Sequence, residues 1–154
     1  MSDKLEVGSN TPSFSLVNQD ETVTSLKDFK GRKLLIYFYP KANTPGCTTQ
    51  SCAVSDSLAE LKAAGVDAVG ISPDTPSAQK KFDEKYGLGF PLLCDEDHAV
   101  AEAFGVWGEK SMYGKKYMGI VRSAFLVDEK GKIEAVWYKV SPTDTVPNVK
   151  SVLT

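Results

Sequence analysis

The sequence lacks the features by which several large classes of protein are recognised, such as membrane spans, secretion signals and strong net charge. Among its 154 residues there is one histidine and there are three cysteines, and the formal net charge is −2. No apolar run approaches the length of a membrane span, and residues 1–6 lack the apolar core of a secretory signal. A nearly neutral chain also has no electrostatic basis for binding nucleic acid or an anionic membrane. We therefore expect neither nucleic acid nor membrane as a partner.

The small, odd number of cysteines argues against a structural disulfide framework. It favours free, catalytic or metal-bound thiols in a reducing compartment, so we expect a cytoplasmic protein. The rest of the composition, 42% hydrophobic and 25% charged, is that of an ordinary globular protein. The length suits one domain, residues 1–154, with a sizeable core, and no repeat, linker or low-complexity segment divides it.

Hydrophobic periodicity predicts alternating strands and helices. Strands are expected at 14–17, 22–24, 33–39, 67–72, 90–94, 121–127 and 133–138, the first two forming a hairpin. A helical turn is expected at 26–29, and helices at 45–64, 77–86, 97–104 (capped by Asp95) and from 143 onward, where Val149, Val152 and Leu153 face inward. The weak pattern of 107–119 predicts a loop that runs into a strand. This order predicts an α/β fold with a layered sheet.

The segment between the apolar run 33–39 and the following helix has the strongest chemical signal. Thr44 is an expected N-cap, and Pro45 would be the first helical residue, where its missing N–H costs nothing. Cys47 then lies in the first turn, where the positive end of the helix dipole favours a thiolate. Helical spacing relates Cys47 to Ser51, Val54, Leu58 and Leu61, which predicts that Cys47 heads the inward stripe in a shielded pocket.

Cys52 follows five residues later, roughly 140° around the same helix. In an unbroken helix the Cα atoms of Cys47 and Cys52 would be about 8.6 Å apart, from the standard rise and radius. A disulfide tolerates at most about 6.8 Å, so a Cys47–Cys52 bond would require the first helical turns to unwind. The alternative is that the two are unconnected core cysteines.

The third cysteine, Cys94, ends a predicted strand and is best explained as a buried, inert thiol. Together with Asp95, Asp97 and His98 it could form a metal site. Aspartates at a helix start usually cap the helix, however, and His98 has no histidine partner. We expect no metal and no cofactor.

The sequence resembles the peroxiredoxins. Pro40, Thr44 and Cys47 match the spacing of the family's active-site motif, and a second cysteine five residues on is similar to the bacterioferritin comigratory protein group, also called peroxiredoxin Q. Further similar segments follow in the same order: 70–72 with Asp74, 90–93 with Asp95, 104–110 and 119–128. The resemblance covers roughly Gly8 to the mid-130s. It departs at Ala124, where the group often has Thr, and in a brief C-terminal end.

The resemblance implies a thioredoxin-like fold, a central mixed sheet flanked by helices, with an N-terminal β-hairpin added. It implies a peroxidase with a role in antioxidant defence and redox homeostasis. Cys47 would be the peroxidatic residue that forms a sulfenic acid, and Cys52 the resolving residue. Thr44 and Pro40 would shape and orient the peroxide pocket. By pattern alone Arg122 is an ordinary strand arginine whose stem crosses apolar neighbours; the resemblance makes it an active-site cation.

The expected partners are a hydroperoxide substrate and a dithiol reductant, which in this family is usually thioredoxin. Both cysteines lie on one predicted helix, so turnover needs no dimer; we expect a monomer, with a dimer possible. Two other functions remain open. A thiol-disulfide oxidoreductase or redox sensor could use the same fold, although such proteins normally carry Cys-x-x-Cys. A non-enzymatic Cys/His metal module is the other.

Overall fold

The computed structural model describes residues 4–153. Its elements follow in this order: β1 (Ser15–Val17), β2 (Val23–Ser25), the 3-10 helix η1 (Leu26–Phe29), β3 (Lys33–Phe38), α1 (Pro45–Asp56), α2 (Leu58–Ala63), β4 (Val66–Ser72), α3 (Pro76–Tyr86), β5 (Leu92–Cys94), α4 (Ala99–Ala103), β6 (Trp107–Met112), β7 (Lys115–Ile120), β8 (Ser123–Val127), β9 (Ile133–Trp137) and α5 (Thr145–Leu153). In the part of the chain described, no helix is both long and apolar enough to cross a bilayer.

The central sheet has the strand order β5-β4-β3-β8-β9. β3 pairs in parallel with β4, and β4 with β5, whereas β8 runs antiparallel to both β3 and β9. The expected mixed sheet is therefore confirmed. The expected N-terminal hairpin is confirmed too, as β1 pairs antiparallel with β2. Because β3 lies in the middle and is covered on both faces, its sequence is almost wholly apolar.

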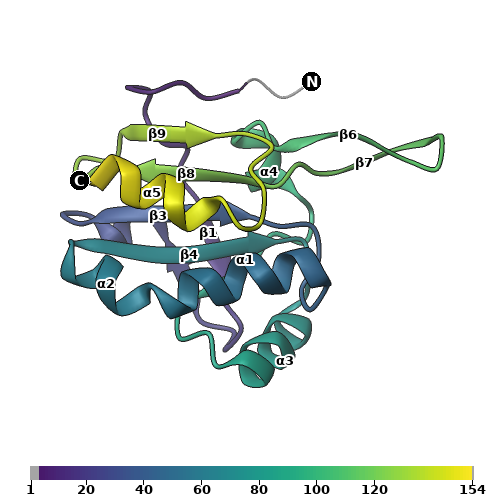
Figure 1. The fold of residues 1–154 in the computed structure, drawn as a ribbon, viewed down its shortest axis with the longest axis horizontal. Coiled ribbons are helices and arrows are strands. Elements are labelled where there is room, and N and C mark those ends of the chain that lie inside the picture. Colours follow the sequence, from purple (N-terminus) through teal and green to yellow (C-terminus); the bar gives the residue numbers. More distant parts are fainter. Residues whose placement is uncertain (1–3, 154) are drawn as a thin grey trace.

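Alternate residues of β3 enter two separate cores, because successive strand side chains point to opposite faces. Leu35 and Tyr37 pack in one core together with Cys47, Val54 and residues of α2, α3 and α5. Figure 1 shows α1, α2 and α5 over this face of the sheet. The other β3 side chains pack against α4 and the segment before β1. The fold therefore presses the first turns of α1 against the carboxyl end of β3.

Several predicted boundaries were wrong. The helix expected at 45–64 is two helices that meet at Ser57, within a Ser-Asp-Ser run of weak helix formers. α4 begins at Ala99 rather than 97. In α5, Val149 is buried as expected, but Val152 is 39% exposed. Val121 and Arg122 precede β8 instead of belonging to it.

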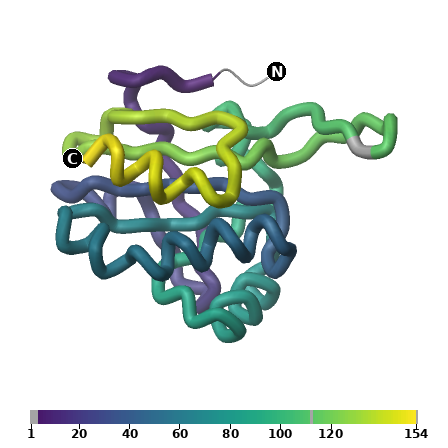
Figure 2. The backbone as a smooth tube through the Cα atoms, viewed as in Figure 1, coloured from purple at the N-terminus to yellow at the C-terminus, as the bar shows by residue number. Residues whose placement is uncertain are grey.

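The largest error concerns 107–119, which was expected to be a loop that runs into a strand. It forms the two-stranded hairpin β6–β7, with a register from Trp107↔Ile120 to Met112↔Lys115. Figures 1 and 2 show this hairpin projecting beyond the rest of the chain. Its strands carry little hydrophobic alternation because most of its side chains face water, which leaves no periodic signal in the sequence.

Candidate active site

The N-terminus of α1 presents Cys47 to the interior. Thr44 has the extended backbone of an N-cap, Pro45 opens the helix, and the Cys47 side chain is 1% exposed. Ser51 and Val54, next on the same helical face, are fully buried. The predicted inward stripe is thus present, and the first-turn N–H groups of α1 face the same region as the thiol.

The loop that leads into α1 is tied to the neighbouring strand by a buried hydrogen-bond network. The Ala42 N–H and the Ser72 hydroxyl both donate to Asp74 Oδ2, each at 2.7 Å. The Gln79 side-chain amide donates to Ser72 Oγ at 2.9 Å and accepts a hydrogen bond from the Tyr39 hydroxyl at 2.6 Å. Because these partners are buried and mutually satisfied, they fix the path of the loop before Cys47.

Arg122 brings a cation to the thiol. Its Nη2 lies 3.4 Å from Cys47 Sγ, and its Nη1 donates to Gln50 Oε1 at 2.8 Å. Gln50 is itself buried and donates from Nε2 to the hydroxyl of Thr145, the first residue of α5, at 2.9 Å. The guanidinium fork is therefore held in one orientation, with one nitrogen on the glutamine and the other on the sulfur.

Gly46 is what allows the guanidinium to come this close. A Cβ at this position would lie 2.9 Å from Arg122 Nη2 and 3.5 Å from Pro142 Cγ. The absent side chain leaves the space in which the guanidinium approaches the first turn of α1.

Lys110, on the β6–β7 hairpin, adds a second cation to this region. Its Nζ donates to the carbonyl of Ile120 at 2.8 Å, two residues before Arg122. Burial lowers the pKa of Lys110, the Arg122 guanidinium lowers it further, and Cys47 acts in the opposite direction. The hairpin base, the arginine and the thiol therefore share one electrostatic neighbourhood.

Thr44 and Pro40 lie in the loop between β3 and α1. The Thr44 hydroxyl does not cap α1 as expected; it donates to the carbonyl of Lys41 at 2.7 Å. With its one hydrogen used in this way, Thr44 Oγ1 is left as an acceptor. Pro40 is half-buried and follows Tyr39, whose ring is fully buried.

Cys47 and Cys52 both lie inside the regular helix α1, and both thiols are free. Cys52 is half-buried and packs against the core beneath α1. Burial raises the pKa of Cys52, and the Asp56 carboxylate one turn later raises it further. At neutral pH this second thiol is therefore kept protonated while the helix is intact.

Cys94 and its neighbours Asp95 and His98 are engaged in packing and helix capping. Burial raises the pKa of Cys94 to about 12. Asp95 accepts hydrogen bonds from the backbone N–H groups of Val100 and Ala101 at 3.1 and 2.8 Å, so it caps the start of α4. The His98 ring stacks on Trp107 at 3.7 Å. Among the described residues, no group of three or more His, Cys, Asp or Glu side chains could hold a metal ion.

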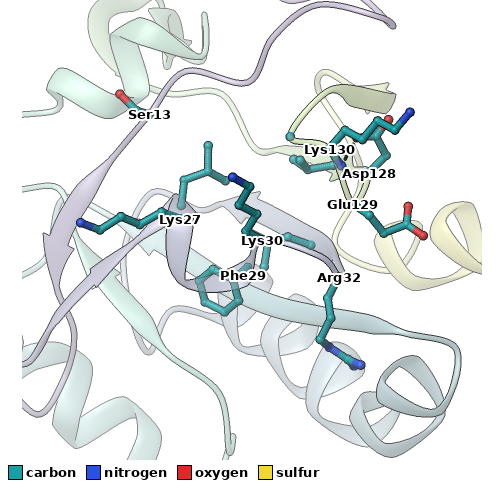
Figure 3. A pocket seen from close by; sticks show the side chains of 12 residues that line it. Ser13, Lys27, Phe29, Lys30, Arg32, Asp128, Glu129 and Lys130 are labelled. Carbon is teal, nitrogen blue, oxygen red and sulfur yellow. Dashed lines mark hydrogen bonds between the residues drawn. The ribbon is translucent and has the colours of Figure 1, made fainter.

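A partly open, mainly apolar pocket lies far from the thiol. It has a volume of about 230 Å³ and is bounded by Phe29, by Leu34 at the start of β3 and by Val127 at the end of β8. Figure 3 shows Lys27, Lys30 and Lys130 around it. Because Cys47 follows the other end of β3, this cavity is not part of the site around the thiol.

Sequence reasoning missed four side chains of the site: Gln50, Asp74, Gln79 and Lys110. Gln50 carried a usable signal, since it lies three residues after Cys47 and so near the same helical face. Asp74 and Lys110 appeared only within segments that resembled the family. Nothing local marked Gln79, because its partners lie on other elements of the fold.

The geometry agrees with three comparisons with known proteins. The model of the AhpC/TSA family matches residues 7–136. Peroxiredoxin Bcp of Escherichia coli (strain K12) is 56% identical over 133 residues, covering 86% of this chain and 85% of the relative. A putative peroxiredoxin bcp of Haemophilus influenzae is 54% identical over 140 residues, covering 91% and 90%.

Solved structures agree as well. Peroxiredoxin Q of Xanthomonas campestris superposes with a TM-score of 0.85 at 39% identity, covering 91% of this chain and 89% of that one. PrxQ of Xylella fastidiosa gives a TM-score of 0.92 at 29% identity, covering 99% and 97%. These similarities agree with the thioredoxin-like sheet and with the buried thiol that faces Arg122 at a helix start. The chain therefore belongs to the AhpC/TSA family, in its bacterioferritin comigratory protein, or peroxiredoxin Q, group.

Proposed function

We propose that this protein is a thiol-dependent peroxidase that reduces hydrogen peroxide and organic hydroperoxides to water and alcohols. The observation that carries the proposal is the contact of Arg122 Nη2 with Cys47 Sγ, 3.4 Å apart at the N-terminus of α1. A guanidinium and a helix start both stabilise negative charge on sulfur, which is the nucleophilic form. Family membership supports the same reaction, and a Xanthomonas campestris relative is described with alkyl peroxide reduction activity.

In the first step the Cys47 thiolate attacks the terminal oxygen of the hydroperoxide. The S–O bond forms as the O–O bond breaks, and the leaving oxygen takes a proton to become an alcohol or water. Thr44 Oγ1 would accept the hydrogen bond of the peroxide O–H, since its own hydrogen is used on Lys41. Arg122 would meet the charge that develops on the oxygens, and Pro40 would limit entry of water. Cys47 is left as a sulfenic acid.

In the second step the Cys52 sulfur attacks Cys47 Sγ. The S–S bond forms, the S–O bond breaks and hydroxide leaves as water after taking a proton. The two cysteines are five residues apart on one regular helix, so the N-terminal turns of α1 must unwind first. Unwinding also exposes Cys52 to water, which reverses the burial that keeps it protonated. Resolution within one chain needs no second subunit, and we propose that a monomer completes the cycle.

In the last step a dithiol protein, we propose thioredoxin, reduces the Cys47–Cys52 disulfide and is itself oxidised. Two electrons and two protons pass to the protein, so the whole cycle converts a hydroperoxide and a dithiol into an alcohol, water and a disulfide. Three free thiols and a disulfide that must be reduced in each cycle suit a reducing compartment, which supports our proposal of the cytoplasm.

The test is peroxide consumption with thioredoxin, its reductase and NADPH. Cys47→Ser should abolish turnover, whereas Cys52→Ser should consume about one equivalent and stop, because the sulfenic acid cannot be resolved. Cys94→Ser is the matched control and should turn over normally, since that thiol is buried and protonated. Normal turnover by Cys47→Ser would refute the proposal. Reduction of insulin disulfides without any peroxide consumption would favour a thiol-disulfide oxidoreductase in its place.

A further inference from the structure

The β6–β7 hairpin, here called the arm, is an isolated two-stranded ribbon. Its strands pair only with each other and are joined by the two-residue turn Tyr113-Gly114. Figure 1 shows it extending away from the central sheet. Two-stranded ribbons are marginally stable in water, and both edges of this one are unpaired. Only the base of the arm packs against the rest of the described fold, through Trp107 and Ile120, so most of the ribbon has no core to stabilise it.

The tip of the arm carries a residue that suits neither the turn nor the surface. Tyr113 is 98% exposed and has a φ of 52°, and Gly114 has a φ of 79°. A turn with two positive φ values favours Asn, Asp or Gly at its first position, because a large side chain is strained there. The ring of Tyr113 contributes no packing to offset this strain, so its presence points to a role outside the folding of this chain.

Alternation along the two strands gives the arm two faces. Lys110 and Tyr117 are cross-strand partners on one of them, and Lys115 is on the same face two residues before Tyr117. We call this the site-side face, because Lys110 bonds the Ile120 carbonyl beside Arg122. Glu109, Lys116 and Met118 are on the opposite face.

The two faces differ in charge. On the opposite face Lys116 Nζ lies 3.6 Å from Glu109 Oε1, so its cation has an anionic neighbour. The site-side face carries the two cations Lys110 and Lys115 and the partly exposed ring of Tyr117, and the only acidic residue of the two strands, Glu109, is on the opposite face. A basic surface with exposed tyrosine, continuous with the region of a reactive thiol, fits a partner whose contact surface is acidic and apolar.

We propose that the site-side face of the arm, with Tyr113 at its tip, is the docking surface for the dithiol protein that reduces the Cys47–Cys52 disulfide. The proposal rests on the function proposed above. That partner would carry apolar and acidic residues around its own reactive thiol. A contact of this kind is small and transient, as befits an electron donor that must leave after each cycle.

Docking would serve a defined exchange reaction. The partner's thiolate attacks one sulfur of the Cys47–Cys52 disulfide, forming a mixed disulfide and releasing the other cysteine as a thiolate that takes a proton. The partner's second thiol then attacks its own sulfur in that mixed disulfide, and the remaining cysteine is released. The arm holds no reacting atom; it raises the rate at which the partner's thiol meets the disulfide.

Neighbouring residues on the two faces supply matched variants for the test. Tyr117→Ser and Lys115→Glu alter the site-side face, whereas Met118→Ser and Lys116→Glu make similar changes on the opposite face. Tyr113→Asn removes the tip ring while fitting the turn better. Each variant is assayed for peroxide turnover with purified thioredoxin as the probe and, separately, with dithiothreitol.

The site-side and tip variants should raise KM for thioredoxin about tenfold, the scale of losing an interface tyrosine. Turnover with dithiothreitol should not change, and the opposite-face variants should match wild type. Equal KM values for all variants, or equal losses on both faces, would overturn the proposal. A third result would also overturn it: the site-side variants lose a dimer that sedimentation detects in the wild type, while their KM for thioredoxin is unchanged. The arm would then bind a second copy of this chain. These results can be distinguished from failure of the proposed peroxidase function. In that case the wild type itself would show no peroxide turnover with dithiothreitol.

Discussion

Gly46→Ala is predicted to separate activity from stability, because the new methyl group meets the guanidinium of Arg122. The added Cβ would lie 2.9 Å from Arg122 Nη2, where ordinary contact begins at 3.4 Å. The obstructing atom is the end of a flexible side chain, so Arg122 yields rather than the helix. Its Nη2 already lies 3.4 Å from Cys47 Sγ, and the displacement weakens or breaks that hydrogen bond.

The two effects can be estimated separately. A hydrogen bond to a charged group contributes about 1.5–3 kcal/mol, so its loss in the reaction of the thiolate slows that step about 10- to 100-fold. Replacing Gly by Ala inside a helix stabilises by about 0.5–1 kcal/mol, which offsets the crowding of the arginine. We therefore expect a large loss of rate with a free energy of unfolding within about 1 kcal/mol of wild type.

The assay should isolate the peroxide step, because a stiffer helix start would also slow the unwinding that precedes disulfide formation. Gly46→Ala is therefore built in a Cys52→Ser background, and formation of the sulfenic acid is followed after mixing with one equivalent of hydrogen peroxide. Thr49→Ala is the control, since Thr49 is exposed on the same helix. Urea unfolding of each variant measures stability.

A double-mutant cycle makes the prediction sharper. If Gly46→Ala acts by displacing the guanidinium, it should have no further effect once Arg122 has been replaced by Met. An unchanged rate for Gly46→Ala, or the same loss in the Arg122→Met background, would refute the argument that Gly46 is required for the approach of Arg122.

Two further predictions follow from the same region. Asp56→Asn should shift the pH midpoint of disulfide formation downward. The Asp56 carboxylate contributes to the raised pKa of Cys52, and the Cys52 thiolate forms as pH rises through that pKa. A midpoint unchanged from wild type, measured by quenched-flow alkylation, would contradict this. Gly70→Ala should lower the free energy of unfolding by about 1–3 kcal/mol, since its Cβ would lie 2.8 Å from the buried Tyr37 hydroxyl and 3.0 Å from the Tyr39 ring. A urea midpoint equal to that of wild type would show that the two rings can move.

Much of the reactive helix could be predicted from short-range rules. Thr44 and Pro45 define the helix start by the conformations they prefer, and the helical period places Cys47 on the buried face. The same rules explain why the predictions for Cys94 and Asp95 agree with the structure: a thiol that ends a short apolar strand is buried, and an aspartate before a helix caps it.

Other parts could not be found this way. Only the base of the arm 107–120 packs against a core, through Trp107 and Ile120, so the pairing of its strands leaves almost no hydrophobic pattern. Arg122 looked like a strand residue, and only the resemblance to the peroxiredoxins indicated that it belongs to the site. Thr44 is the N-cap residue as predicted, but its hydroxyl can bond either the helix N–H groups or the preceding loop, and the loop carbonyl of Lys41 is the one it reaches.

The sequence alone therefore determined that Cys47 lies on the buried face of the first turn of α1 and that Cys52 cannot reach it without unwinding, because both depend on geometry within a few turns of one helix. Only the tertiary structure decided what surrounds the thiol. Arg122 is 75 residues from Cys47 along the chain, and Gln50 joins it to Thr145 across 95 residues. The pairing of β3 with β8 and the packing of α1 against α5 bring these groups together, and such long-range contacts are set by the packing of the whole fold.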